Sequence, residues 1–205
     1  MARLFAVPAL CVVLGFAALP VWAEEAPSPL LADGDRAHLV ELLESSRQEL
    51  ETLVASVDKE TWNHRPDPER WSVGEVVEHL ILAEEALFGM VHQALSSEPD
   101  PEWQTLNQGT EAVETLVQDR SQSFQAPEGL QPTGKVERSK AVADYAAKRA
   151  RTLDFVRGTQ APVKQHVASG PPGKMNVQQW LALVGAHNLR HNRQIADVVE
   201  LLKAK

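Results

Sequence analysis

The sequence predicts an all-α protein in which four amphipathic helices form a bundle. Apolar residues recur at steps of three and four along four segments, whereas the alternation typical of β-strands is scarce. Two of these segments begin with capping-box patterns, SVGE at residues 72–75 and NVQQ at residues 176–179. Each helix has one apolar stripe to bury, and four helices of about 20 residues do so most simply as a four-helix bundle.

The first 23 residues have the layout of a secretory signal peptide. A basic start at Arg3 precedes an apolar run that ends at Leu19, and a small-residue site follows before Glu24. This layout predicts cleavage after Ala23 and export to the periplasm or the cell exterior. The alternative is a retained membrane anchor, which the run suits less well because two prolines interrupt it and a membrane span needs about 20 residues.

Cleavage would leave a linker at residues 24–34 and one folded domain at residues 35–205. The single cysteine, Cys11, leaves with the signal peptide, so the remaining chain has no disulfide and no cysteine metal ligand. The formal net charge of the full chain is −8. Because nucleic-acid binding needs clustered lysine and arginine, the acidic chain is not expected to bind nucleic acid. No contact with a membrane is expected after cleavage.

The first two long helices are predicted on either side of a proline-containing connection. The first covers residues 35–57, and its apolar stripe consists of Leu39, Leu42, Leu43, Leu50, Leu53 and Val57. Two prolines within residues 61–70 prevent this helix from continuing. The second helix begins at Ser72 and ends near Leu95, with a stripe of Val73, Val76, Leu80, Ala83 and Leu87.

Residues 97–137 give the weakest indication of secondary structure in the chain. They are expected to hold a short helix from about Thr105 to Val117 and a loop at residues 125–136. A third long helix then covers residues 139–157 and ends at Gly158, with a face of Val142, Tyr145, Ala146, Leu153 and Val156. After a loop that contains SGPPGK, the last helix runs from Asn176 to about Leu202.

Two histidines, His187 and His191, lie on the apolar stripe of the last helix. That stripe also contains Trp180, Val184, Ile195, Val198 and Leu202. A spacing of four residues places both rings on one face, about 6 Å apart along the helix axis, so both can bind one metal ion at about 2.0–2.1 Å. The pair alone is equally compatible with two hydrogen-bonded histidines in the bundle interior.

His79 adds a third imidazole from a different helix. It flanks the apolar stripe of the second helix, where a lone histidine is more often a core-edge residue with its hydrogen bonds satisfied. Together with His187 and His191 it completes a set of three ligands, and bundle cores commonly hold such sites. Three protein ligands leave coordination positions open, as in catalytic rather than structural metal sites.

The two histidine-bearing segments resemble the DinB-like superfamily. They are RWSVGEVVEHLILAEE at residues 70–85 and QQWLALVGAHNLRHNRQIADV at residues 178–198. The resemblance covers most of residues 35–203 and is weakest over 97–124, where this chain is longer. It implies an up-down-down-up bundle, with a long connection between the second and third long helices, that is often a dimer. It also implies one divalent ion per chain, Zn or Ni ahead of Mn or Fe, held by His79, His187 and His191.

The chemistry of such a site depends on the residues beside the ligands. A divalent ion with open positions polarises a carbonyl or lowers the pKa of a bound water or thiol. Zincin-type hydrolysis needs a glutamate beside the first ligand, but Asn188 follows His187 here. Gln194 lies almost on the histidine face, where its amide either orients a water or substrate carbonyl or hydrogen-bonds a histidine. Glu75 is either a helix cap or a hydrogen-bond partner of the ligands.

Two hypotheses of different kinds follow. In the first, the protein is an enzyme, a metal-dependent hydrolase or a thiol-dependent transferase that acts on a small organic substrate. Export weakens the transferase form, because reduced thiols are scarcer outside the cytosol. In the second, the bundle is not catalytic, and the ion either stabilises the packing of the helices or is transported by the protein. A fourth protein ligand would favour the second hypothesis, and the third long helix offers only Asp144 and Asp154 as candidates.

Overall fold

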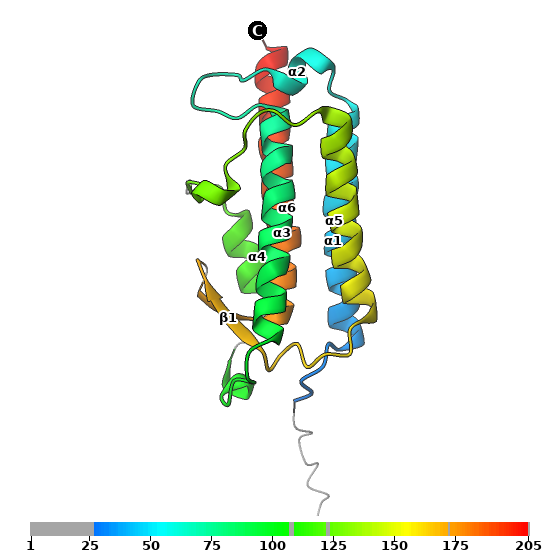
Figure 1. The fold of residues 1–205 in the computed structure, drawn as a ribbon, viewed down its shortest axis with the longest axis vertical. Coiled ribbons are helices and arrows are strands. Elements are labelled where there is room, and N and C mark those ends of the chain that lie inside the picture. The colour runs from blue at the N-terminus through cyan, green and yellow to red at the C-terminus, as the bar shows by residue number, and fades with distance from the viewer. Residues whose placement is uncertain (1–26, 107–108, 122–123, 172, 205) are drawn as a thin grey trace, which may run out of the picture.

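A computed structural model describes residues 27–106, 109–121, 124–171 and 173–204, so the predicted signal peptide at residues 1–23 lies outside it. Four long helices form the bundle: α1 (Asp33–Ala55), α3 (Val73–Leu95), α5 (Arg138–Gly158) and α6 (Val177–Lys203) (Figure 1). The connections contain α2 (Lys59–Asn63), η1 (Trp103–Thr105), α4 (Glu111–Gln118), η2 (Glu128–Leu130), β1 (Val167–Gly170) and β2 (Gly173–Asn176). In this part of the chain no helix is both long and apolar enough to cross a membrane.

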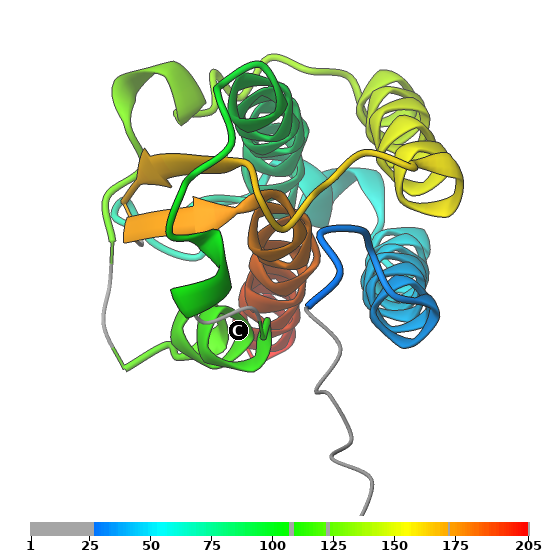
Figure 2. The same ribbon diagram turned by 90° about the horizontal axis from the view of Figure 1, so that it is seen from below.

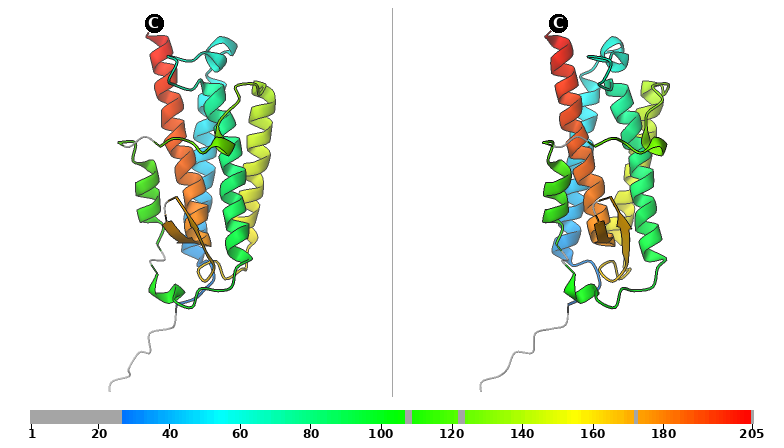
Figure 3. Two further views of the ribbon diagram at one scale, coloured as in Figure 1. Left: turned by 60° about the vertical axis from the view of Figure 1, so that its left-hand side comes forward. Right: turned by 90° about the vertical axis from the view of Figure 1, so that its left-hand side faces the viewer.

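The predicted bundle and its chain directions are confirmed. Helices α1 and α6 run in one direction, and α3 and α5 run in the other, which gives the order up-down-down-up along the chain (Figure 1). The long connection between α3 and α5 travels back along the bundle and includes η1, α4 and η2. Figures 2 and 3 show that α4, η2 and the β1–β2 hairpin lie outside α3 and α6, away from α1 and α5.

Both predicted capping boxes are present. The Ser72 hydroxyl accepts a hydrogen bond from the Glu75 amide at 3.2 Å, and the Glu75 carboxylate accepts one from the Ser72 amide at 2.8 Å. At the start of α6, Asn176 and Gln179 make the same reciprocal pair at 2.9 and 3.1 Å. These bonds satisfy backbone donors that a helix start leaves open, and they fix the residue at which each histidine-bearing helix begins.

Several expectations about the connections and faces were wrong in detail. The short helix α4 begins at Glu111 rather than Thr105, and α2 precedes the prolines that follow the first long helix. The loop before the last helix contains a hairpin, in which β1 pairs antiparallel with β2. The two strands have four residues each and include two glycines, so the sequence shows no alternating apolar pattern from which the strands could be predicted. Val142 is 36% exposed, and Ala141 is buried in its place.

Two apolar clusters fill the two ends of the bundle. The first surrounds the start of α6 and includes Leu39, Leu43, Val91, Leu153, Trp180 and Leu181. The second surrounds its end and includes Leu50, Val54, Val76, Leu80, Ile195 and Val198. Between them lies a set of buried polar residues, one or two from each long helix, which we call the polar layer: Ser46, Glu84, Arg149, Asn188 and Asn192.

An ion pair forms one half of the polar layer. Arg149 of α5 donates two hydrogen bonds to the two carboxylate oxygens of Glu84 on α3, at 3.0 and 2.8 Å. Its remaining terminal nitrogen donates to the Leu43 carbonyl at 2.7 Å and to the Ser46 hydroxyl at 2.8 Å. The Thr152 hydroxyl also donates to Glu84 at 2.8 Å. Both charges are therefore paired and hydrogen-bonded, which is the condition for burying them.

Candidate metal centre

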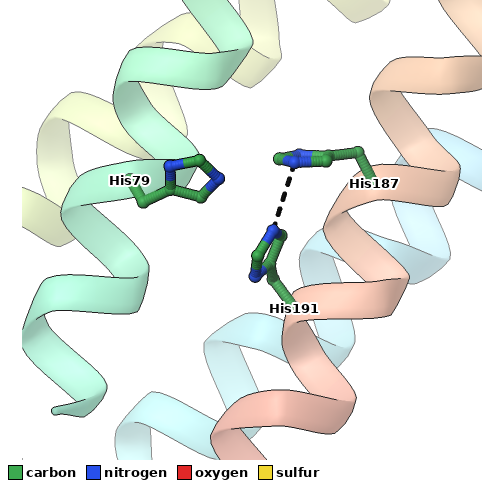
Figure 4. Close-up of side chains that lie close together, drawn as sticks. All are labelled: His79, His187 and His191. Carbon is green, nitrogen blue, oxygen red and sulfur yellow. Dashed lines mark hydrogen bonds between the residues drawn. The ribbon is translucent and has the colours of Figure 1, made fainter. Parts of the chain in front are cut away.

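Three histidines converge between α3 and α6. Figure 4 shows the His79 ring pointing from α3 toward the rings of His187 and His191 on α6. One ring nitrogen from each residue lies within 4.8 Å of the others. The Nε2 atoms of His187 and His191 are 3.1 Å apart, at hydrogen-bonding distance. The structure thus brings together the three residues that the sequence analysis selected.

The surroundings favour the uncharged form of all three imidazoles. His79 and His191 are 4% and 9% exposed, and His187 is half-buried. Burial lowers the pKa of His79, and it lowers the pKa of His191 to about 3 with help from the nearby His79. Burial and the other two histidines lower the pKa of His187 well below its ordinary value. The neutral imidazole is the form that binds a metal ion.

Two histidines use their outer ring nitrogen, the Nδ1 that points away from the group, in a hydrogen bond that fixes the orientation of the ring. Nδ1 of His79 lies 2.8 Å from the Leu130 carbonyl in η2, and Nδ1 of His191 lies 2.7 Å from Oε1 of Gln194. Both partners are acceptors, so each Nδ1 carries the proton and each Nε2 keeps its lone pair. A metal-ligating histidine almost always donates its other N–H in this way.

The structure gives Gln194 and Glu75 specific partners. Gln194 binds the outer nitrogen of His191, which was one of its two expected roles; a direct role in catalysis stays a prediction. The Glu75 carboxylate accepts from the Ser72 amide and from Arg65 at 2.8 Å. Its capping and ion-pair contacts therefore occupy it at the start of α3.

No carboxylate joins the three histidines in the described part of the chain. The three are the only group there in which at least three histidine, cysteine, aspartate or glutamate side chains converge. Asp144 pairs instead with Lys140 on the surface of α5, and the side chain of Asp154 is 79% exposed. Neither aspartate joins the three histidines, and a group of this composition is typical of an open metal site.

Sequence reasoning missed the hydrogen-bonded pair Asn188 and Asn192. Asn188 accepts from the Tyr145 hydroxyl and donates to Asn192 at 2.9 Å. Asn192 donates to the Ser46 carbonyl at 2.9 Å. The sequence HNLRHN at residues 187–192 could have indicated this pair, because an asparagine directly follows each histidine. Consecutive helical residues are about 100° apart around the axis, so the two asparagines share a face next to that of the histidines. These asparagines form the second half of the polar layer and fix how α6 is rotated.

The sequence of the chain matches the family model of the DinB superfamily over residues 42–195, a range that contains all three histidines. The chain belongs to the DinB superfamily. This DinB-superfamily chain is similar to YuaE of Bacillus subtilis (strain 168), an uncharacterized protein. The two are 24% identical over 174 residues, which cover 79% of this chain and 98% of YuaE.

A solved structure supports the fold. YfiT from Bacillus subtilis is described as "a probable metal-dependent hydrolase with an unusual four-helix bundle topology". The match has a TM-score of 0.59 and 14% sequence identity, and it covers 89% of this chain and 95% of YfiT. At this identity the likeness shows that the two proteins share a fold.

The lowered pKa values make the stability of the metal-free protein depend on pH. As the pH is lowered, the histidines bind protons more readily in the unfolded chain than in the folded one, so the free energy of unfolding decreases with decreasing pH. For His191 this amounts to about 2 kcal/mol between pH 7 and pH 5. Urea unfolding at both pH values should show a smaller loss in His191→Gln than in wild type, whereas His64→Gln, at an exposed position, should match wild type. Equal losses in all three proteins would contradict the buried, neutral state.

Proposed function

We propose that the protein is a metal-dependent hydrolase that acts on a small organic substrate through one divalent ion held by His79, His187 and His191. The observation that carries this proposal is the convergence of three neutral imidazoles without a fourth protein ligand in the described part of the chain. Such a set leaves coordination positions open for exchange. The description of YfiT as a probable metal-dependent hydrolase supports the same chemistry.

The donor set fits a borderline divalent ion such as Zn or Ni, because imidazole nitrogens suit both. A bound ion supplies a Lewis acid that polarises a carbonyl and activates water. The protein's own part is to hold the ligands: Leu130 and Gln194 orient His79 and His191 through their outer nitrogens. The centroid of the Trp71 ring lies 5.1 Å from that of the His79 ring, so Trp71 packs against this ligand. The Gln194 amide nitrogen takes no part in the bond to His191, and we assign it to orienting the substrate carbonyl.

The cellular setting belongs to the same proposal. The layout of residues 1–23 supports an exported protein that is cleaved after Ala23 and acts in the periplasm or outside the cell. In that setting a hydrolase needs no reduced thiol, whereas a thiol-dependent transferase does. Membership of the DinB superfamily supports a homodimer as the working form. The net charge of −8 supports a small molecule rather than a nucleic acid as the substrate.

The decisive experiment combines metal analysis with turnover. Tag-free protein is analysed by elemental mass spectrometry, as purified and after reconstitution with Zn, Ni, Mn or Fe. It is then assayed against esters, amides and lactones, with and without a chelator and a low-molecular-weight thiol. About one ion per chain, with hydrolysis that the chelator abolishes and the same ion restores, is the expected result.

Three outcomes would overturn the proposal. If no ion binds even after reconstitution, the three histidines are a hydrogen-bonded core cluster. If an ion binds but no substrate is hydrolysed in a chelator-sensitive way, the non-catalytic bundle is correct. If turnover requires the added thiol, the protein is a thiol-dependent transferase.

A further inference from the structure

The loop at residues 126–134, which contains η2, is attached to α3 at three points. Figure 3 shows η2 beside the N-terminal half of that helix. The Leu130 carbonyl lies 2.8 Å from Nδ1 of His79. The Thr133 hydroxyl and the Gly134 amide donate to the two carboxylate oxygens of Glu78, at 2.8 and 2.9 Å. Two consecutive residues of α3 therefore hold this loop, and one of them is a candidate metal ligand.

Glu78 differs from the other buried acids of α3. Its side chain is buried, with a residue exposure of 6%, and both of its oxygens accept from the loop. Glu75 is paired with Arg65, and Glu84 is paired with Arg149. Among the described residues no cation pairs with Glu78. A buried carboxylate held only by neutral donors is costly to desolvate, so its hydrogen bonds to the loop are the contacts that compensate for its burial.

Leu130 lies close in the chain to the two residues that Glu78 holds, because only Gln131 and Pro132 separate it from Thr133 and Gly134. The Leu130 amide donates to the Pro127 carbonyl at 2.8 Å, and Gln131 donates to the Ala126 carbonyl at 3.3 Å. Gly134 has a φ of 69°, in the left-handed region that favours glycine. The hydrogen bonds close the first part of the loop, at residues 126–131. The short link through Gln131 and Pro132, whose ring fixes φ, then ties the Leu130 carbonyl to the anchored end.

We propose that Glu78 is a positioning residue for His79. By holding Thr133 and Gly134, it keeps the Leu130 carbonyl against Nδ1 of His79. That bond keeps the proton on Nδ1 and turns the lone pair of Nε2 toward His187 and His191. The inference rests on the proposed metal centre, to which it adds a residue that does not touch the ion. Loss of such an outer hydrogen bond lowers metal affinity by about 10- to 100-fold.

The test uses the full chain and two readouts. Long-range ¹H–¹⁵N NMR reports which nitrogen of His79 carries the proton in the metal-free protein, and competition with a chelator reports the affinity for Zn²⁺. Glu78→Ala is expected to bind Zn²⁺ about 10- to 100-fold more weakly and to show a mixture of His79 tautomers. Glu78→Gln keeps one acceptor oxygen and should recover part of the affinity. Glu85→Gln removes an exposed carboxylate from the same helix and should match wild type in both readouts.

A purely structural role for Glu78 gives a different pattern. In that case Glu78→Ala is less stable but retains a single Nδ1–H tautomer at His79 and wild-type Zn²⁺ affinity, which overturns the proposal. If Glu78→Ala does not fold, Thr133→Val decides, because Thr133 is exposed and its replacement removes one of the two loop bonds. An unchanged tautomer and affinity in Thr133→Val then overturn the proposal. If wild type binds no Zn²⁺, the metal centre fails, while the tautomer readout still tests Glu78.

Discussion

Replacing His191 with alanine is expected to abolish stoichiometric binding of a divalent ion. The change removes one of three convergent ligands and the hydrogen-bond partner of both His187 and Gln194. Two ligands from different helices remain, and they cannot enclose an ion. The affinity should therefore fall by more than about 100-fold, beyond the loss that follows when only an outer hydrogen bond to a ligand is removed.

Elemental mass spectrometry and Zn²⁺ titration of the purified variant measure this loss. His187→Ala should behave like His191→Ala, and His79→Ala should weaken binding severely. His64→Ala is the matched control, because His64 is an exposed histidine outside the group and its loss should leave one ion per chain. Wild-type metal content in all three site variants would show that these histidines are not the ligands.

Replacing Arg149 with methionine is expected to lower the free energy of unfolding by about 3–5 kcal/mol. The Arg149 side chain is fully buried, and its partner Glu84 is 3% exposed. Methionine preserves much of the side-chain volume but leaves the Glu84 carboxylate buried with only the Thr152 hydroxyl as a described donor. The Leu43 carbonyl also loses the guanidinium contact. The uncompensated carboxylate is the larger cost, because removing one partner of a buried pair leaves a bare charge in the core.

Chemical denaturation of the metal-free protein measures the effect. Arg151→Met is the matched control on the same helix, because its ion pair with Glu85 has both side chains about half exposed and should contribute less than about 1 kcal/mol. Glu84→Leu combined with Arg149→Met removes both charges and should recover a large part of the loss. A cost for Arg149→Met no larger than that for Arg151→Met would contradict a buried pair.

The fold and the histidine triad were predictable because their signals are local or periodic. The stripe through His187, His191 and Ile195 follows from helix geometry, and it places both histidines on one face without any knowledge of the tertiary structure. The capping boxes at Ser72 and Asn176 similarly mark the start of both histidine-bearing helices within four residues of sequence. His79 joins the pair because a four-helix bundle brings its long helices together.

The groups around the triad could not be predicted, because they depend on contacts between distant residues. The Leu130 carbonyl that orients His79 comes from 51 positions later in the chain, and a backbone carbonyl has no sequence signature. In the sequence, Glu78 is one of several polar residues of an amphipathic helix. Nothing near it in the chain shows that a distant loop covers it. A shared face for Asn188 and Asn192 could have been predicted, since their spacing of four residues is the same as that of the two histidines. Their partner Ser46, however, lies on α1.

The side-by-side placement of histidines and asparagines on α6 fixes the orientation of this helix at the site. If α6 turned by one residue, the imidazoles would enter the core and the amides would enter the site, with the partners of both lost. Sliding by one turn would break the bond from Asn192 to Ser46 in the same way. Helix α6 is therefore held in one orientation and one register. The opposite wall of the site carries the loop at residues 126–134, whose side chains are mostly exposed. Fewer buried contacts hold that wall, so we expect it to open at a lower free energy than α6 does.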